Sequence, residues 1–115
     1  MKDFYCNEII SKKTKVDIVY ETGYILAFHH TMPHFETHIV IIPKKHIESL
    51  STFDNCSTLS LEFFKAISFV TKLVENKCGG CRISSNVGDY QSTKHLHWYV
   101  HYGKRLRNED GSMIT

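Results

Sequence analysis

The sequence lacks any apolar run of about 18 residues, the length needed to cross a bilayer. It also lacks an excess of charge of one sign, because 14 basic and 12 acidic residues leave a formal net charge of +2. Proteins that bind nucleic-acid polymers need a clustered basic face to displace counterions, so this balance argues against that class. The N-terminus carries acidic residues before any apolar stretch, which is not typical of a secretion signal. We therefore expect a cytoplasmic protein without a membrane segment.

The chain has little room for more than one domain, since it contains 115 residues. A chain of this size buries only about two-thirds of the surface that its unfolded form exposes, so pairing with a second copy would add stability. The apolar fraction of 42% is that of an ordinary globular core, and no repeat or low-complexity segment is present. We expect one domain over residues 1–115, with a polar tail over about 104–115.

Cysteine is scarce, with four residues in the chain: Cys6, Cys56, Cys78 and Cys81. A reducing cytoplasm favours free thiols over disulfides. The C-x-x-C spacing of the last two is also found in redox centres and in half of a zinc site. A redox pair is expected at the start of a helix after a strand, whereas this pair follows a predicted helix and precedes a strand. The pattern therefore favours a glycine turn with a buried Cys81 over redox or metal chemistry.

Two periodicities predict the secondary structure. Apolar residues recur every three or four positions between 57 and 76 and predict a long amphipathic helix, in which Phe63, Phe64 and Phe69 are expected in the core. A shorter helix is expected over residues 7–13. Because strand pairs come first and the long helix interrupts them, the order favours an α+β fold with an antiparallel sheet. Runs of β-branched and aromatic residues predict its five strands over 17–20, 24–30, 37–42, 81–87 and 94–101.

Histidine is the most unusual residue in this composition, because the chain has eight and they are clustered. Four lie between residues 28 and 38, and three lie between 95 and 101. In a strand, alternate side chains share a face, so the second cluster separates into a polar and an apolar face. An imidazole can exchange a proton, attack as a nucleophile or bind a metal near neutral pH, so a groove along the polar face suits a metal ion or a phosphate. The polar face would carry His95, His97, Tyr99 and His101, and the apolar face Leu96, Trp98 and Val100.

This segment resembles the motif of the histidine triad (HIT) superfamily, His-φ-His-φ-His-φ-φ, in which φ is apolar. The similarity covers about residues 4–105 and points to the nucleotide-binding protein branch of the superfamily. It implies an α+β, HIT-like fold with a five-stranded antiparallel sheet and one long and one short helix. It also implies a homodimer that binds a purine nucleotide or nucleotide conjugate on each subunit. Further matching residues are Thr-His-Ile-Val-Ile-Ile-Pro-Lys-Lys-His-Ile over 37–47, and a lead-in formed by Asn86, Gly88, Gln91 and Ser92.

The resemblance also implies a chemistry and the residues that perform it. Members of the superfamily hydrolyse or transfer a nucleoside monophosphate group from phosphoramidates or dinucleoside polyphosphates, through a nucleotidyl-histidine that splits one difficult displacement into two easier ones. His97 corresponds to the nucleophile, and His38 to the residue that holds and polarises it. The implied catalytic set is His38, Ser92, His95, His97 and Tyr99. The implied nucleotide contacts are Tyr5, Ile9 and Ile10 around the base, His30 and Thr31 at the ribose, and Asn86, Gln91 and Ser92 around the phosphate and leaving group.

Two positions depart from the family pattern. The third triad position is Tyr99, whose hydroxyl can donate one hydrogen bond but cannot supply positive charge at neutral pH. Stabilisation of developing charge is often worth about 3 kcal/mol per group, so the alternative to an enzyme is a nucleotide-binding module with low activity. His101 lies one step along the same face, roughly 7 Å beyond Tyr99. His30 stands where family members often carry an acidic residue for the ribose hydroxyls, which leaves sugar selectivity open.

The resemblance implies no obligatory cofactor, but it raises a structural zinc site. Some relatives bind zinc through two N-terminal cysteines and two histidines, and Cys6, His46 and His95 match three of these positions. Asp3 stands at the fourth, where a carboxylate is an acceptable ligand although structural sites favour sulfur and nitrogen. A metal-binding protein built on these residues is therefore a third hypothesis, beside the enzyme and the nucleotide-binding module.

Overall fold

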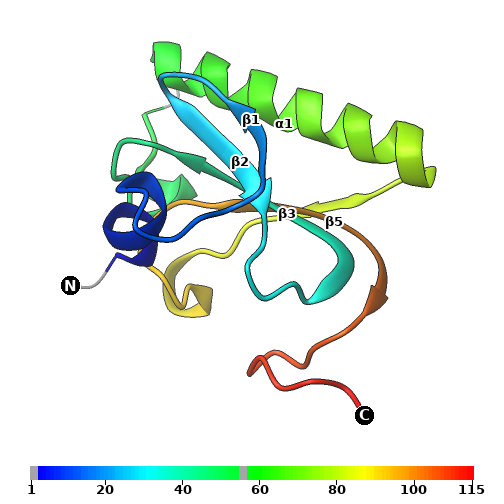
Figure 1. Cartoon of the computed structure of the whole chain (residues 1–115). Coiled ribbons are helices and arrows are strands. Elements are labelled where there is room, and N and C mark those ends of the chain that lie inside the picture. Colours follow the sequence, from blue (N-terminus) through cyan, green and yellow to red (C-terminus); the bar gives the residue numbers. More distant parts are fainter. Residues whose placement is uncertain (1–2, 55–56) are drawn as a thin grey trace.

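The computed structural model describes residues 3–54 and 57–115, so the prediction of a free thiol at Cys56 lies outside the described residues. A five-stranded antiparallel sheet carries one long helix on one face (Figure 1). The predicted α+β class, the sheet and the long helix are confirmed. The strands are β1 (Ile18–Glu21), β2 (Ile25–His29), β3 (Phe35–Pro43), β4 (Arg82–Ser84) and β5 (Trp98–Arg105), in the spatial order β1-β2-β3-β5-β4. The long helix is α1 (Thr58–Cys78), and the short helical segments of the described chain are η1 (Tyr5–Ile10), η2 (Leu50–Thr52) and η3 (Gly88–Tyr90).

α1 is stabilised at both ends and along one face. The Ser57 hydroxyl accepts a hydrogen bond from a backbone N–H of the first turn, and Gly79, with a φ of +92°, ends the helix in a left-handed conformation. The apolar stripe that includes Phe63 packs on the sheet, but the prediction that Phe64 and Phe69 are core residues is wrong, since they are 73% and 47% exposed. Each residue advances the helix by about 100°, so the residue after Phe63 faces away from the sheet. No described helix is long and apolar enough to span a membrane.

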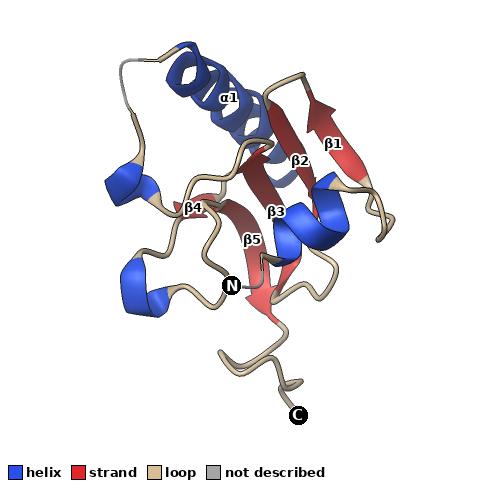
Figure 2. Cartoon of the chain, turned by 90° about the vertical axis from the view of Figure 1, so that its left-hand side faces the viewer, coloured by secondary structure: helices blue, strands red, loops and turns tan. Residues whose placement is uncertain are grey.

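The sheet separates two apolar cores. The larger core lies between α1 and the sheet and includes Ile39, Ile41 and Val100. On the opposite face, η1 contributes Tyr5 and Ile9 to a smaller core (Figure 2). The central strand β3 is therefore buried on both faces along its second half, which accounts for its unbroken apolar run.

The boundaries of three elements near the site differ from the prediction. The N-terminal helix is one short turn over Tyr5–Ile10 instead of residues 7–13. β5 begins at Trp98, so the first two histidines of the motif lie in the segment that leads into the strand. β4 covers only three residues of the predicted 81–87.

The polar tail begins later than predicted, because residues 104–105 belong to β5. Beyond the strand, the N–H of Leu106 donates to the carbonyl oxygen of His34 (2.7 Å), and Arg107 forms an isolated antiparallel bridge with Met113. The C-terminal segment is therefore tied to the loop that precedes β3.

Candidate active site

His97 lies just before β5 with its ring in a fixed orientation. Its Nδ1–H donates to the carbonyl oxygen of His95 (2.7 Å), so the proton of the neutral ring is on Nδ1 and Nε2 carries a lone pair. The side chain is 2% exposed, and in the described part of the chain no other group forms a hydrogen bond with its ring. Burial lowers the pKa of His97, which keeps the ring neutral near pH 7. An unprotonated imidazole nitrogen held in this way is suited to act as a nucleophile.

The alternation predicted for residues 95–101 is confirmed. The apolar members are buried beneath α1 or packed against the same core. The polar members lie on the other face, where the centroid of the Tyr99 ring is 5.0 Å from that of His97. His101 continues this face along β5, with its ring stacked on Phe35 at 4.0 Å. The motif therefore forms one row of polar rings along the sheet.

The ring of His38 contacts Tyr99 and not His97. The centroids of His38 and Tyr99 are 4.6 Å apart, and His38 also stacks on His30 at 4.5 Å. Strand register explains the offset, because His38 pairs with His101 and His97 lies four positions earlier in the chain. Among the ring contacts of the described residues, none joins His38 to His97. The prediction that His38 holds His97 directly is wrong, and Tyr99 lies between them.

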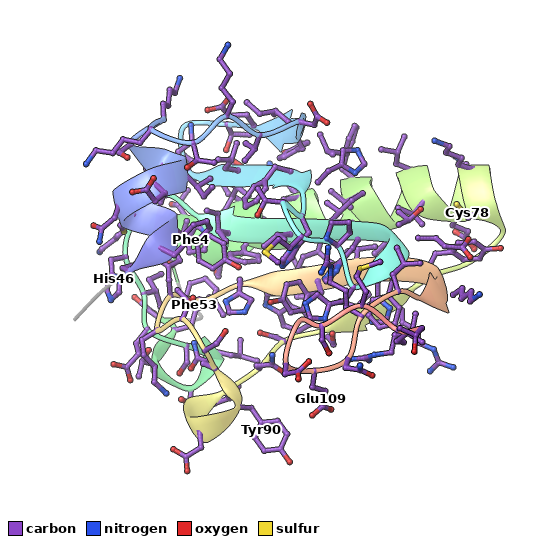
Figure 3. The ribbon with its side chains drawn as sticks, turned by 60° about the horizontal axis from the view of Figure 1, so that its bottom comes forward. Phe4, His46, Phe53, Cys78, Tyr90 and Glu109 are labelled. Atoms are coloured by element: carbon purple, nitrogen blue, oxygen red, sulfur yellow. The ribbon has the colours of Figure 1, made fainter. Side chains whose placement is uncertain are left out.

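A cavity of about 700 Å³ opens beside His38, Tyr99 and His101, and neither His95 nor His97 is among its lining residues. Its size is that of a small-molecule site. Figure 3 shows two residues of its rim, Tyr90 and Glu109, on the same side of the molecule. The predicted site residues that line the cavity are His38, Asn86, Ser92 and Tyr99. The other lining residues are His34, Phe35, Ser84, Asp89, Tyr90, His101, Arg105 and Glu109.

Two of the lining residues that sequence reasoning missed are Tyr90 and Arg105. Tyr90 lies on the short turn η3, which has no periodicity to reveal it, and its ring is 84% exposed. Arg105 was assigned to a solvated tail, but it lies at the end of β5, and its guanidinium carbon is 5.3 Å from the centroid of Phe35. A prediction that continued β5 four residues further would have included Arg105.

Several predicted nucleotide contacts do not line this cavity. Tyr5 and Ile9 are buried in the smaller core, where they cover the apolar face of the sheet opposite α1. Ile10 lines a separate hollow of about 350 Å³, and Thr31 is exposed in the loop after β2. His30 is half-buried, with its ring on that of His38 and not on the cavity wall. The predicted base and ribose contacts thus lie outside the lining of this cavity and remain predictions.

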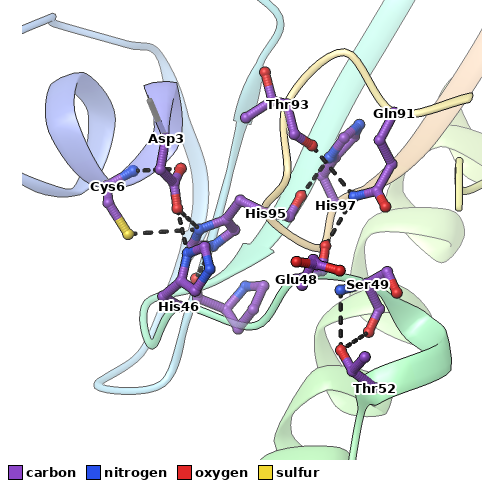
Figure 4. Close-up of polar contacts among 11 residues, drawn as sticks. Asp3, Cys6, His46, Glu48, Ser49, Thr52, Gln91, Thr93, His95 and His97 are labelled. Atoms are coloured by element: carbon purple, nitrogen blue, oxygen red, sulfur yellow. Dashed lines mark hydrogen bonds and ion pairs between the residues drawn. The ribbon is translucent and has the colours of Figure 1, made fainter. Parts of the chain in front are cut away.

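The side chain of Gln91 holds the loop before β5 in place through hydrogen bonds to backbone groups. Its amide nitrogen donates to the carbonyl oxygens of Glu48 (2.8 Å) and Thr93 (3.2 Å) (Figure 4). Its amide oxygen accepts from the N–H of Gly88 (3.1 Å). The side chain is buried, and backbone groups occupy both ends of the amide. The side chain thereby fixes the loop that carries the exposed Ser92, and its contact with the nucleotide remains a prediction.

The predicted metal candidates converge with Asp3 at the N-terminal end of the site. Ligand atoms of Asp3, Cys6, His46 and His95 all lie within 4.8 Å of one another. Nδ1 of His95 is 2.7 Å from Oδ2 of Asp3 and 3.5 Å from Sγ of Cys6, and Nδ1 of His46 contacts the same carboxylate oxygen (Figure 4). His95 also carries the carbonyl oxygen that holds His97, so this cluster and the candidate nucleophile are adjacent.

The donor set of this cluster fits zinc. Nε2–H of His95 donates to the carbonyl oxygen of Pro43 (2.8 Å), so Nδ1 of the neutral ring directs a lone pair at a carboxylate oxygen. Two lone pairs this close need a proton or a cation between them. Although burial acts to raise it, hydrogen bonding, chiefly from the Cys6 N–H, lowers the pKa of Asp3 to about 2, so the carboxylate is ionised. One sulfur, one oxygen and two nitrogen atoms are all accepted ligands of tetrahedral zinc.

The C-x-x-C pair forms a turn, as the sequence predicted. Cys78 ends α1, Gly79 has a positive φ, and Cys81 precedes β4. Both thiols are free and half-buried, so Cys81 is less buried than predicted. Both side chains pack against the larger core.

Comparison with known proteins agrees with this geometry. The family model described as the HIT domain matches residues 11–105. A HIT-like protein of Azospirillum brasilense is 37% identical over 101 residues, which cover 84% of this chain and 80% of that protein. A HIT-like protein of Rickettsia prowazekii is 33% identical over 107 residues, which cover 86% of each chain. The structure of a HIT family hydrolase from Clostridium thermocellum superposes with a TM-score of 0.74 at 26% identity, covering 89% of this chain and 90% of that chain.

The chain therefore belongs to the HIT family, and its fold is that of HIT family hydrolases.

Proposed function

We propose that this HIT family protein cleaves a bond at the α-phosphorus of a nucleotide conjugate, of the nucleoside phosphoramidate or dinucleoside polyphosphate type. The observation that carries the proposal is the fixed tautomer of His97, which presents an unprotonated Nε2. The cavity beside Tyr99 is large enough for a nucleotide. A purine base is the family expectation.

The proposed reaction has two displacements. In the first, the Nε2 lone pair of His97 forms a bond to phosphorus, and the leaving amine or phosphate departs with the electron pair of the broken bond and takes up a proton. In the second, water attacks the nucleotidyl-histidine, the P–N bond breaks, and His97 is restored with release of the nucleoside monophosphate. Asn86 and Ser92 line the cavity and can bind phosphate oxygens. No cofactor is needed for either step.

Incubation of the purified protein with an adenosine phosphoramidate tests this proposal. We expect release of AMP and free amine over many turnovers, followed by chromatography. Nucleotide binding without product would instead support the alternative, a nucleotide-binding module of low activity, which Tyr99 at the third triad position favours.

We also propose that the cluster of Asp3, Cys6, His46 and His95 binds zinc. The protein is expected to retain about one zinc per chain after dialysis. Zinc should also raise the Tm, because the ion forms bonds to the Asp3 oxygen and the His95 nitrogen, whose lone pairs otherwise face one another. His46→Ala should weaken zinc affinity at least about tenfold, measured against a chromophoric chelator. His29→Ala is the matched control, because that histidine is exposed and lies outside the cluster. Equal affinity in His46→Ala and wild type would contradict the proposal.

We further propose that the protein is a homodimer. β4 is an edge strand whose three residues are all exposed, and α1 exposes Leu61 and Phe64 on the face away from the sheet. Exposed strand edges and apolar faces are surfaces that partners cover. Sedimentation equilibrium should give twice the 13.4 kDa chain mass, and a monomer at micromolar concentration would contradict the proposal.

A further inference from the structure

Arg105 is held in a fixed orientation at the end of β5. Its Nε–H donates to the carbonyl oxygen of Arg107 (2.6 Å), and its guanidinium carbon lies 5.3 Å from the centroid of the Phe35 ring. The Phe35 ring also stacks on His101, at 4.0 Å and with an interplanar angle of 15°. An arginine that is already held by a backbone oxygen and an aromatic face loses less side-chain entropy when it binds a ligand. Arg105 is therefore preorganised for binding.

The two terminal amino groups of Arg105 have no partner in the described part of the chain. Nε is the one guanidinium nitrogen that forms a hydrogen bond there, and no described carboxylate forms an ion pair with it. Asp89 and Glu109 line the same cavity as Arg105, but neither is paired with it. The remaining N–H groups form a planar fork that matches two oxygens of a carboxylate or a phosphate. This fork is thus available to an oxyanion of a ligand.

Arg105 is the positive charge of the cavity wall. It is the only lysine or arginine among the described residues that line the cavity. Burial lowers the pKa of His34 and of His101, and neighbouring arginines, Arg105 among them, lower both further. Burial and the neighbouring histidines, with a contribution from Arg105, lower the pKa of His38 to about 3. The three imidazoles are therefore mainly neutral near pH 7, and no carboxylate shifts the pKa of any of them.

The guanidinium lies at the end of the cavity that is remote from the candidate nucleophile. β5 carries the lining residues Tyr99, His101 and Arg105 in this order, and the Tyr99 ring is 5.0 Å from that of His97. An in-line displacement at phosphorus places the leaving group opposite the attacking atom. The base and ribose contacts predicted from the sequence lie outside the cavity lining, which leaves this end of the cavity for the leaving group.

We propose that Arg105 binds an oxyanion carried by the leaving group, a carboxylate or a phosphate, and so makes the protein selective for nucleotide conjugates with an anionic leaving group. This inference rests on the proposed function and assigns Arg105 a role in specificity, with no part in bond breaking at phosphorus. The guanidinium is exposed, so solvent screens its attraction for the oxyanion and the selectivity is modest.

Two adenosine phosphoramidates that differ in the charge of the leaving amine test this contact. One carries γ-aminobutyrate, which has a free carboxylate, and the other carries its neutral amide. Arg105→Gln should lower the ratio of kcat/KM for the carboxylate to kcat/KM for the amide about fivefold relative to wild type, the effect of a screened ion pair. Arg105→Lys should lower the ratio less. Any difference in basicity between the two amines is the same for every variant, so the change in the ratio isolates the contact.

Lys104→Gln is the matched control, because it removes the same charge from an exposed neighbouring residue that does not line the cavity. Its ratio should stay within about twofold of wild type, as for surface substitutions generally. Diadenosine triphosphate, whose leaving group is ADP, supplies the phosphate in place of the carboxylate. If Arg105→Gln lowers kcat/KM more for this substrate than for the γ-aminobutyrate conjugate, the preferred oxyanion is a phosphate, and the reverse identifies a carboxylate.

Equal losses of kcat/KM in Arg105→Gln for the neutral amide and for both anionic substrates would overturn the inference and leave Arg105 a structural residue. Turnover by the wild type together with such equal losses would retain the proposed function and reject this contact. Absence of turnover of all three substrates by the wild type would reject the proposed function. The same ratio is then taken from the dissociation constants of the two conjugates by calorimetry, where a loss of preference in Arg105→Gln retains the contact and an unchanged preference rejects it.

Discussion

Replacing His97 by alanine is expected to lower the turnover of adenosine phosphoramidate at least about a hundredfold. The reason is that Nε2 of His97 is the one atom proposed to bond to phosphorus, and its lone pair is set by the Nδ1–H donated to the His95 carbonyl oxygen. Affinity for AMP should fall much less, because the proposed phosphate contacts lie on other residues. The measurement is initial rate under saturating substrate, with AMP affinity determined in parallel.

His29→Ala is the matched control for this variant, because it removes an exposed imidazole. We expect its rate to remain within about twofold of wild type, as for surface substitutions generally. His97 is buried, so the unfolding transition of His97→Ala must confirm that the variant is folded. A folded His97→Ala protein that retains more than about a tenth of the rate would contradict the assignment of the nucleophile.

Replacing Phe63 by alanine is expected to lower the free energy of unfolding by about 3–5 kcal/mol, the range for deleting a buried aromatic ring. Phe63 is 2% exposed and lies in the core between α1 and the sheet, so the substitution leaves a cavity. Asn76→Ala is the control on the same helix, because that side chain is exposed and lies outside the proposed dimer face of Leu61 and Phe64, and it should change stability by no more than about 0.5 kcal/mol. Urea unfolding at pH 7 measures both. Equal losses would show that α1 buries a different face.

The features that could be predicted from the sequence are those set by local periodicity. The three-and-four spacing located α1, and the alternation after His95 separated the apolar row that packs beneath α1 from the polar rings on the opposite face. The prediction about Phe64 and Phe69 failed because apolar character alone does not specify which side of the helix a residue occupies. The buried residues of α1 follow one another at intervals of three or four, and neither Phe64 nor Phe69 falls on this spacing: they are Phe63, Ala66, Val70 and Val74.

The contacts that could not be predicted join parts of the chain that are far apart in sequence. The offset between His38 and His97 depends on the register of β3 against β5, and no local pattern sets that register. The amide of Gln91 is occupied by the carbonyl oxygen of Glu48, 43 residues away. The metal candidates could be named from the resemblance. That His46 and His95 share one carboxylate oxygen of Asp3 depends on the tertiary fold and could not be predicted.

The most direct test of the account is to stop the reaction with adenosine phosphoramidate during turnover and locate the covalent intermediate by peptide mass spectrometry. We predict that the mass of one nucleoside monophosphate is added to the peptide that contains His97, that the label is lost in acid, and that it is absent from His97→Ala. Turnover with the label on another residue, or with no label under conditions that preserve phosphohistidine, would contradict the central claim.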